Sequence, residues 1–294
     1  MSTPEKIFNV LDYGAIGDGV TDDTAAIQAA INAAVASSLA TAPGGKLYAP
    51  PGLTFKTTAT LAIVKPIMAE FLSMINYTGT SSAALCVGGT GWQQYYDLRF
   101  FGFTAVNGNS AQPNSVNANG SIGVRFNNFV FSRFQCEVIQ GFTNAGVYMD
   151  GMGDVTPPQV IQHNRFDFGQ IVNNGIGINC QSANAATSSV EANFVHISDL
   201  YQCFFGAILD NQNASAATTS NYFLIDALDD ANQSGGGQGM QINGCFNRID
   251  ITYLGCNIWF GATSAHNTLN VYNTAATGAT YTAGGSSNHY NIVT

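Results

Sequence analysis

The second half of the chain repeats a short segment that begins with asparagine and then alternates apolar and polar residues. The segments start at Asn164, Asn193, Asn221, Asn247 and Asn267, so successive starts are 29, 28, 26 and 20 residues apart. Alternation of period two is typical of a β-strand, because successive side chains point to opposite faces. Repeats of this length are typical of solenoids, in which each coil packs only against its neighbours. The repeat therefore predicts an all-β solenoid of stacked parallel strands.

The alternation also predicts which side chains line the core. In the first strand of each repeat, one inward column is Phe166, Val195, Phe223, Ile249 and Leu269, and its neighbour is Phe168, Ile197, Ile225, Ile251 and Val271. A second strand follows in each repeat, with Val147, Met149, Ile176, Ile178, Met240, Ile242, Ile258 and Phe260 pointing inward. Asp150, Asn179, Asp210 and Asn243 end this second strand and are predicted to form one ladder of bonds at a turn. The polar segments 181–192, 211–220 and 229–239 are interpreted as loops along one edge.

The N-terminal region has a different pattern. A short apolar strand, Phe8 to Leu11, leads into a turn rich in glycine and aspartate. Carboxylates at Asp22 and Asp23 then precede an amphipathic run whose apolar residues have helical spacing. Acidic residues favour the start of a helix, because they accept hydrogen bonds from free amides and oppose the helix dipole. A helix is therefore expected at about 22–37.

This N-terminal string resembles a known family. Residues 9–33, NVLDYGAIGDGVTDDTAAIQAAINA, and residues 44–52, GGKLYAPPG, are similar to the signature of the pectate-lyase-superfamily domain, which occurs in bacteriophage tailspikes and capsule depolymerases. The resemblance implies a single-stranded right-handed parallel β-helix whose end is capped by a short α-helix. It divides the chain into an N-terminal strand and capping helix, 1–44, and a right-handed parallel β-helix domain, 45–294.

Composition argues against several classes of function. The chain has nine basic and 18 acidic residues, a net charge of −9 and no clustered basic stripe, so nucleic-acid binding is not expected. No apolar run is long enough to insert into a membrane, and Met1–Lys6 does not have the pattern of a secretory signal peptide. The six cysteines lack the spacing of metal ligands, so free thiols and no metal or other cofactor are expected.

Outward positions of the first strand form a stripe that suits a glycan. Aromatic rings can stack on the C–H surfaces of sugars, and charged groups can bind hydroxyl and acid groups. The substrate-binding residues predicted on this basis are Arg165, Asp167, Phe194, Tyr222 and Arg248. Arg133, Gln135 and Glu137 belong to the same stripe one turn earlier, in a register that the sequence leaves less certain.

Two carboxylates of the stripe are candidates for catalysis. Asp226 and Asp250 fall on neighbouring turns, with Cβ atoms roughly 7–8 Å apart, which is compatible with the separation of about 5–9.5 Å in glycoside hydrolases. Arg248 would keep Asp250 ionised, while Asp226 beside apolar neighbours would act as the acid. The alternative is that both are solvated surface carboxylates paired with arginine.

Three further residues are weaker candidates. His196 could serve as acid or base, or lie idle on the surface. Asp229 and Asp230 could be a second catalytic pair at the mouth of the 229–239 loop, or could cap that loop.

The polygalacturonase branch of the resemblance can be tested on its motifs. Those enzymes carry Asn-Thr-Asp, Asp-Asp and Gly-His-Gly before the second strand of consecutive turns, with Arg-Ile-Lys further on. The corresponding segments here are 173–175 (NNG), 203–206 (CFFG) and 237–239 (GQG), and 248–250 (RID) matches only in part. Because the essential carboxylates are missing, a pectin-cleaving site is not expected.

The resemblance and the stripe together favour a phage tailspike-type protein of a virion tail, or one encoded by a prophage. Such a protein would act at the host cell surface by binding a bacterial polysaccharide (capsule, exopolysaccharide or O-antigen) and cleaving it, with hydrolysis favoured over elimination. The alternatives are a glycan-binding virion or adhesin module without catalysis and, less favoured, a secreted pectinase-like enzyme. Tailspike-type β-helices are generally homotrimers, and the outward apolar residues Tyr148, Ile208 and Trp259 predict the subunit contact.

Overall fold

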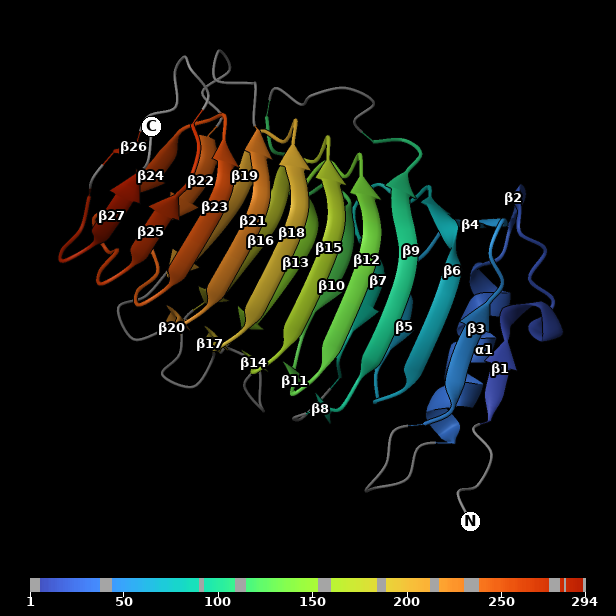
Figure 1. The fold of residues 1–294 in the computed structure, drawn as a ribbon. Helices are drawn as coiled ribbons and strands as arrows, with labels where there is room; N and C mark the ends of the chain where they lie inside the picture. Colours follow the sequence, from blue (N-terminus) through green and yellow to red (C-terminus); the bar gives the residue numbers. More distant parts are fainter. Residues whose placement is uncertain are drawn as a thin grey trace.

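The computed structural model describes residues 6–37, 44–89, 93–108, 115–152, 160–183, 189–211, 217–229, 238–274, 281–282 and 284–292. Over these residues the chain winds into three sheets that run side by side along one axis, with β1 at one end and β27 at the other (Figure 1). Every strand pair within the described residues is parallel, for example β15 with β18 and β18 with β21. The predicted parallel β-helix is therefore confirmed.

The three sheets differ in length and are named accordingly. The long sheet has the order β1 (Ile7–Asn9), β3 (Lys46–Ala49), β6 (Met68–Tyr77), β9 (Asp97–Ala105), β12 (Arg133–Gln140), β15 (Arg165–Val172), β18 (Phe194–Tyr201), β21 (Tyr222–Asp229), β23 (Arg248–Leu254), β25 (Thr268–Val271) and β27 (His289–Ile292), and β2 (Asp18–Asp22) and β4 (Thr54–Thr57) join it at β6. The second sheet comprises β5 (Leu61–Ile63), β7 (Ala83–Val87), β10 (Ile122–Phe126), β13 (Ala145–Met152), β16 (Ile176–Ala183), β19 (Phe205–Asn211), β22 (Gln238–Ile242), β24 (Ile258–Phe260) and β26 (Tyr281–Thr282). The short sheet comprises β8 (Gln93–Gln94), β11 (Phe129–Val130), β14 (Val160–Gln162), β17 (Ser189–Glu191) and β20 (Ala217–Thr219).

The inward columns of the long sheet are those that the alternation predicts. Phe166 pairs with Val195, Val195 with Phe223, and Phe223 with Ile249, and all are buried. The neighbouring column from Phe168 to Val271 is in register and buried as well. These stacked apolar side chains make a continuous core, because each coil covers the apolar face of the one before it.

A buried asparagine ladder marks the start of successive strands of the long sheet from β15 onward. Asn164, Asn193, Asn221, Asn247 and Asn267 are each at most 3% exposed. From Asn193 onward, each side-chain carbonyl accepts hydrogen bonds from the backbone N–H and the side-chain amide of the asparagine one turn earlier, as Asn221 does from Asn193 at 3.1 and 3.0 Å. The carbonyl of Asn164 accepts instead from the backbone N–H of Ser132. The asparagine amide also donates to a backbone carbonyl, as Asn193 does to Ile161. The repeat asparagines thus satisfy buried polar groups at a corner that the sheets leave unpaired.

The predicted ladder at the end of the second strand is partly wrong. Asp150 pairs with Gln181, and Gln181 pairs with Asp210, while Asn179 lies two residues earlier between Tyr148 and Ile208. This two-residue shift in register follows from a column of stacked glycines. A Cβ on Gly177 would lie 2.4 Å from the carbonyl oxygen of Gly206 on the next turn. A side chain cannot fit there, so Gly177 and not Gly175 is the residue that stacks. Asp210 and Asn243 do interact across neighbouring turns, but through a side-chain-to-side-chain bond and not the predicted side-chain-to-backbone bond: the Asn243 amide donates to Asp210 Oδ1 at 3.2 Å.

Two of the predicted loops are not simple loops. The 181–192 segment contains β17 and the 211–220 segment contains β20, both strands of the short sheet. Strands of two or three residues are too short for an alternation to be recognised in the sequence. Most of the third predicted loop, 230–237, lies outside the described residues.

The expected N-terminal cap is present as α1 (Thr24–Ala36), which follows the 3-10 helix η1 (Val10–Tyr13). The helix covers the end of the solenoid beside β1, β3 and β5 (Figure 1). Its buried residues include Ile27 and Ile31, which belong to the hydrophobic core. Asp23 accepts hydrogen bonds from the N–H groups of Ile16 and Gly17, so its buried carboxylate holds the preceding turn. β1 pairs with β3, which makes this first coil continuous with the solenoid; the boundary at residue 44 stays a prediction.

All six cysteines are free thiols, as their sequence context predicts. Tyr148, Ile208 and Trp259 are partly exposed on the outer face of the second sheet, with Asn179 between the first two and Gln241 between the last two. No helix within the described residues is long and apolar enough to cross a membrane.

Candidate functional site

Two rows of outward side chains cross the strands of the long sheet. The first row is Asp97, Arg133, Arg165, Phe194, Tyr222, Arg248 and Thr268, and the second row is Arg99, Gln135, Asp167, His196, Leu224, Asp250 and Asn270. The predicted stripe is therefore present. The register that was less certain for Arg133 is settled by its pairing with Arg165. Because neighbouring parallel strands are about 4.8 Å apart, each row places one side chain at that interval along the axis.

The centre of the first row is aromatic and is flanked by two guanidinium groups. The rings of Phe194 and Tyr222 meet edge to face, with centroids 5.3 Å apart. Arg165 lies over Phe194 and Arg248 over Tyr222, each 5.0 Å from the ring centroid. Cation–π contacts of this kind are electrostatically favourable and fix the orientation of both partners. The predicted substrate-binding residues thus form one connected surface.

Asp250 is held firmly by its neighbours. Its carboxylate accepts hydrogen bonds from Arg248 (2.9 Å from Nη2), from the hydroxyl group of Tyr222 (2.8 Å) and from Asn270 (2.6 Å). Burial opposes ionisation of Asp250, but these hydrogen bonds outweigh it and lower its pKa below the usual value. The side chain is only 4% exposed. The lowered pKa favours the ionised form of Asp250, but its oxygens are occupied, which suits a role in positioning Arg248 and Tyr222.

His196 lies between two carboxylates on adjacent turns. Its Nε2 is 3.2 Å from Asp226, and its Nδ1 is 3.8 Å from Asp167. Asp167 in turn accepts two hydrogen bonds from Arg165, at 2.8 and 3.0 Å, and Arg133 lies 3.7 Å away. Asp226 is half exposed, so its carboxylate is accessible from outside. The predicted neighbours Asp226 and Asp250 do lie on adjacent turns, but the closer partner of Asp226 is His196.

Asp199 and Asp229 form a further pair of carboxylates, where the long sheet bends. Asp199, on the same strand as His196, pairs in register with Ala227, directly after Asp226. Burial, followed by the nearby negative charge of Asp229, raises the pKa of Asp199. Asp229 is exposed at the end of β21, and Asp230 lies outside the described residues. Asp199 was not predicted, because two outward residues in succession, Ser198 and Asp199, break the alternation at the bend.

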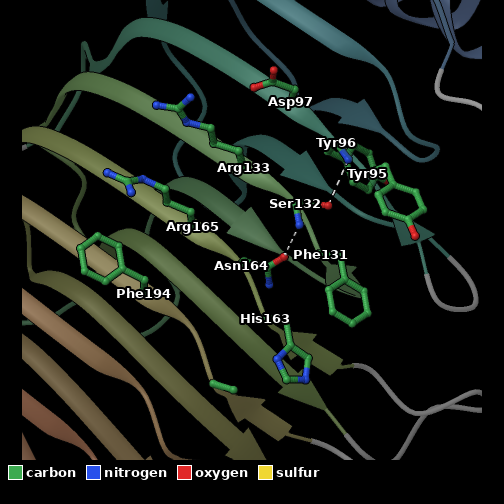
Figure 2. Close-up of a pocket in the computed structure, with 11 residues that line it drawn as sticks. Tyr95, Tyr96, Asp97, Phe131, Ser132, Arg133, His163, Asn164, Arg165 and Phe194 are labelled. Carbon is green, nitrogen blue, oxygen red and sulfur yellow. Dashed lines mark hydrogen bonds between the residues drawn. The ribbon is translucent and has the colours of Figure 1, made fainter.

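A hollow of about 700 Å³ lies at one end of the first row, at the corner between the short and long sheets (Figure 2). Figure 2 shows Arg133 and Arg165 on one side of it and the rings of Tyr95, Phe131 and His163 on the other. The planes of Phe131 and His163 are within 6° of parallel, with centroids 5.0 Å apart. These exposed aromatic residues were not predicted as part of a site. In the sequence, His163 stands just before Asn164, the first asparagine of the ladder. Phe131 stands just before Ser132, which occupies the same position one turn earlier and donates its N–H to Asn164.

Within the described residues, no group of three or more histidine, cysteine or acidic side chains could hold a metal ion.

The N-terminal part of the chain matches a known family. Residues 7–69 match the model of the rhamnogalacturonase A/epimerase, pectate lyase-like family. The mannuronan C5-epimerases AlgE5 and AlgE4 of Azotobacter vinelandii are 62% and 58% identical to this chain over 45 residues, which is 15% of the chain and 4% and 7% of those proteins. The chain thus matches only a small part of these relatives. The resemblance expected from the N-terminal signature is confirmed over this segment.

A solved structure shows the same fold over nearly the whole chain. The ORF18 protein of Geobacillus virus E2 superposes on 98% of this chain and 61% of its own, with a TM-score of 0.65 and 18% identity. The chain therefore spans less than two thirds of that protein. The alignment with the Dettilon tailspike protein gp208 covers 94% of this chain and 68% of that protein, with 16% identity and a TM-score of 0.38.

Proposed function

We propose that this protein binds a bacterial surface polysaccharide across the outward face of the long sheet and hydrolyses it there, in the manner of a phage tailspike. One observation carries the proposal. The contact of 3.2 Å between His196 and the exposed carboxylate of Asp226 lies on the same strands as the Phe194–Tyr222 ring pair. An acid–base centre thus adjoins a surface suited to sugars.

Binding is assigned to the first row and its supports. Phe194 and Tyr222 offer ring surfaces to the apolar faces of sugars. Arg165 and Arg248 are more than half exposed and keep donors for hydroxyl or acid groups of the glycan. Asp167 and Asp250 hold these two arginines in place by bidentate or multiple hydrogen bonds.

Cleavage is assigned to Asp226, His196 and Asp199. Asp199 has a raised pKa, so in its acid form it donates a proton to the glycosidic oxygen as the bond breaks. Asp226 takes a proton from the attacking water, and His196 orients the carboxylate of Asp226. From strand geometry the Cα atoms of Asp199 and Asp226 are about 6 Å apart, so both side chains can reach one bound sugar.

The comparisons support the general class of this proposal. The N-terminal match is to proteins named for their action on mannuronan, a polysaccharide. The structure with the same fold comes from a virus, in line with a phage-associated protein that meets its glycan at a cell surface.

The experiment that tests the proposal is incubation with a panel of capsular, exopolysaccharide and O-antigen preparations. We expect new reducing ends without the absorbance of an unsaturated uronate. Asp226→Asn and Asp199→Asn should each lower the rate by about 10²–10⁴-fold, whereas Asp12→Asn, at the exposed N-terminal end, should have no effect. Near-normal rates in both site variants would refute the assignment. Binding without new reducing ends would instead favour a glycan-binding module, and the uronate absorbance would favour elimination.

A homotrimer is part of the proposal. Tyr148, Ile208 and Trp259 project from the second sheet, away from the rows of the long sheet, so contact through them leaves the glycan surface free. Light scattering at micromolar concentration should give three times the chain mass of 30.9 kDa. A monomeric mass would count against the tailspike role.

A further inference from the structure

The corner between the short and long sheets carries one residue per turn in an unfavourable backbone conformation, and five of the six residues described below are exposed. Phe131, His163, Ala192, Ser220, Phe246 and His266 have φ angles of 47°, 56°, 54°, 57°, 55° and 54°. Each donates its N–H to a carbonyl group of the next turn, as Phe131 does to Gln162 and His163 to Glu191, so the six residues follow the solenoid axis in order. Glycine and asparagine adopt this left-handed conformation most easily, and bulky residues do so at a cost.

The aromatic residues at this corner gain little burial in return. Phe131 and Phe246 are 51% and 60% exposed. Tyr95, one turn before Phe131, has a φ of 68° and is 62% exposed. Strained residues that are not required for packing are concentrated at functional sites. The corner rings therefore call for a function other than stability.

The corner and the first row complement one another turn by turn. Where the corner residue is aromatic, the first row holds no ring two residues later: an arginine follows Phe131, His163 and Phe246, and Thr268 follows His266. Where the corner residue is small, at Ala192 and Ser220, the first row holds a ring, Phe194 or Tyr222.

Every one of six successive turns consequently presents one aromatic ring. The rings fall into three contacting pairs, Phe131–His163, Phe194–Tyr222 and Phe246–His266, with centroids 5.0, 5.3 and 4.9 Å apart. We call these six residues the aromatic rail. Five steps of about 4.8 Å make it about 24 Å long.

We infer that the aromatic rail binds the polysaccharide as an extended chain that runs parallel to the solenoid axis, with successive sugars against successive turns. This inference rests on the proposed function for the class of ligand and adds the direction of the chain and its subsites. A pyranose in an extended chain advances by about the interval between turns, so its repeat can match the spacing of the rings. Arg133, Arg165 and Arg248 line the same path and can bind hydroxyl or acid groups beside the rings. The 700 Å³ hollow at Phe131 and His163 gives one end of the rail depth for a sugar (Figure 2).

The test separates ligand binding from stability. Asparagine tolerates the left-handed conformation, so Phe131→Asn and Phe246→Asn should relieve strain while removing two rings. Wild-type protein and the double variant are applied to an array of bacterial capsular, exopolysaccharide and O-antigen polysaccharides. We expect at least a tenfold loss of binding in the double variant, with a melting temperature equal to or above that of the wild type. Tyr13→Ala, an exposed aromatic change in η1 at the N-terminal cap, is the matched control and should bind normally.

The length of the ligand tests the direction of the chain. For size-fractionated oligosaccharides from a polysaccharide that binds, affinity should rise with each added sugar and level off when the chain spans the six turns. Unchanged binding by the double variant, a lowered melting temperature with unchanged binding, or the absence of binding to every polysaccharide would overturn the inference. A change in oligomeric mass of the double variant would also overturn it, since the rail would then be an interface between copies. Wild-type binding that depends on the rail without cleavage would leave the inference standing and refute only the proposed hydrolysis.

Discussion

The hydroxyl group of Tyr222 donates a hydrogen bond of 2.8 Å to Asp250, which lies on the next turn and two residues further along its strand. The same carboxylate holds Arg248, whose guanidinium lies over the Tyr222 ring. Three residues on two turns are thus fixed relative to one another. A carboxylate in this arrangement acts on a ligand through the side chains that it orients.

The first prediction concerns this arrangement. Asp250→Asn should free Arg248 and Tyr222 to move, and so raise the KM for the polysaccharide by about tenfold, equivalent to about 1.4 kcal/mol, with a small change in kcat. Tyr222→Phe keeps the ring and should change KM less. Steady-state kinetics on a polysaccharide that is cleaved will check both. A collapse of kcat with unchanged KM in Asp250→Asn would return Asp250 to the catalytic role that the sequence predicted.

The second prediction is the effect of pH on stability through Asp250. Its pKa in the folded protein is lowered from the ordinary value of 3.8. A carboxyl group whose pKa is lower in the folded than in the unfolded state contributes stability above the unfolded value, and this contribution is lost as the pH falls through the folded value. Chemical denaturation gives the free energy of unfolding of the wild type and of Asp250→Asn at each pH between about 2 and 6. The two free energies should differ most above about pH 4 and converge in acid. A difference that grows in acid would contradict the assignment.

The third prediction tests the apolar columns. Phe223 is 1% exposed and stacks between Val195 and Ile249. Phe223→Ala should lower the free energy of unfolding by about 3–5 kcal/mol, because adjacent turns cannot close the cavity. Leu224→Ala, at the next and outward position, is the matched control and should cost clearly less. If urea denaturation gave the same loss of unfolding free energy for Phe223→Ala and Leu224→Ala, the two faces of β21 would be equally buried and the prediction would be wrong.

The fourth prediction concerns the asparagine ladder. Asn193→Ala removes the acceptor of the Asn164 N–H and the donor to the Ile161 carbonyl, both buried. Each buried polar group left unsatisfied costs about 1–3 kcal/mol, so the melting temperature should fall markedly. Asn144→Ala loses a single surface hydrogen bond to Ala118 and should be nearly neutral. Similar melting temperatures for the two variants would exclude a stabilising role for the ladder.

The inward columns could be predicted from the sequence because a strand has a fixed period of two, so one buried residue determines its neighbours. Phe223 and Ile225 lie inward for this reason, and the outward register of Tyr222 and Arg248 followed from it. The second strand was misaligned by two residues around Asn179, because Gly175 and Gly177 are equivalent in a pattern. Only the close approach of Gly177 to Gly206 distinguishes them.

The site was predicted less completely than the fold. Outward residues such as His196 and Asp226 follow from the alternation, but their contact across turns depends on side-chain rotamers. Phe131 and Phe246 lie between strands, where no alternation applies and where the left-handed conformation is visible only in three dimensions. One available pattern was the residue that precedes Ser132 and each repeat asparagine. Its order of Phe, His, Ala, Ser, Phe and His is the complement of the residue two positions later.

The last prediction concerns Asp199 and Asp229. The charge of Asp229 contributes to the raised pKa of Asp199, after the larger effect of burial. If Asp199 is the acid, activity must fall as the pH rises through its pKa in the free enzyme. Asp229→Asn removes the negative charge and should lower the pKa of Asp199, so the alkaline limb of the kcat/KM profile should move to lower pH while the maximal rate changes little. Asp12→Asn provides the control. An alkaline limb that stays in place, or that moves to higher pH, would show that another group is the acid and would separate the role of Asp199 from that of Asp226.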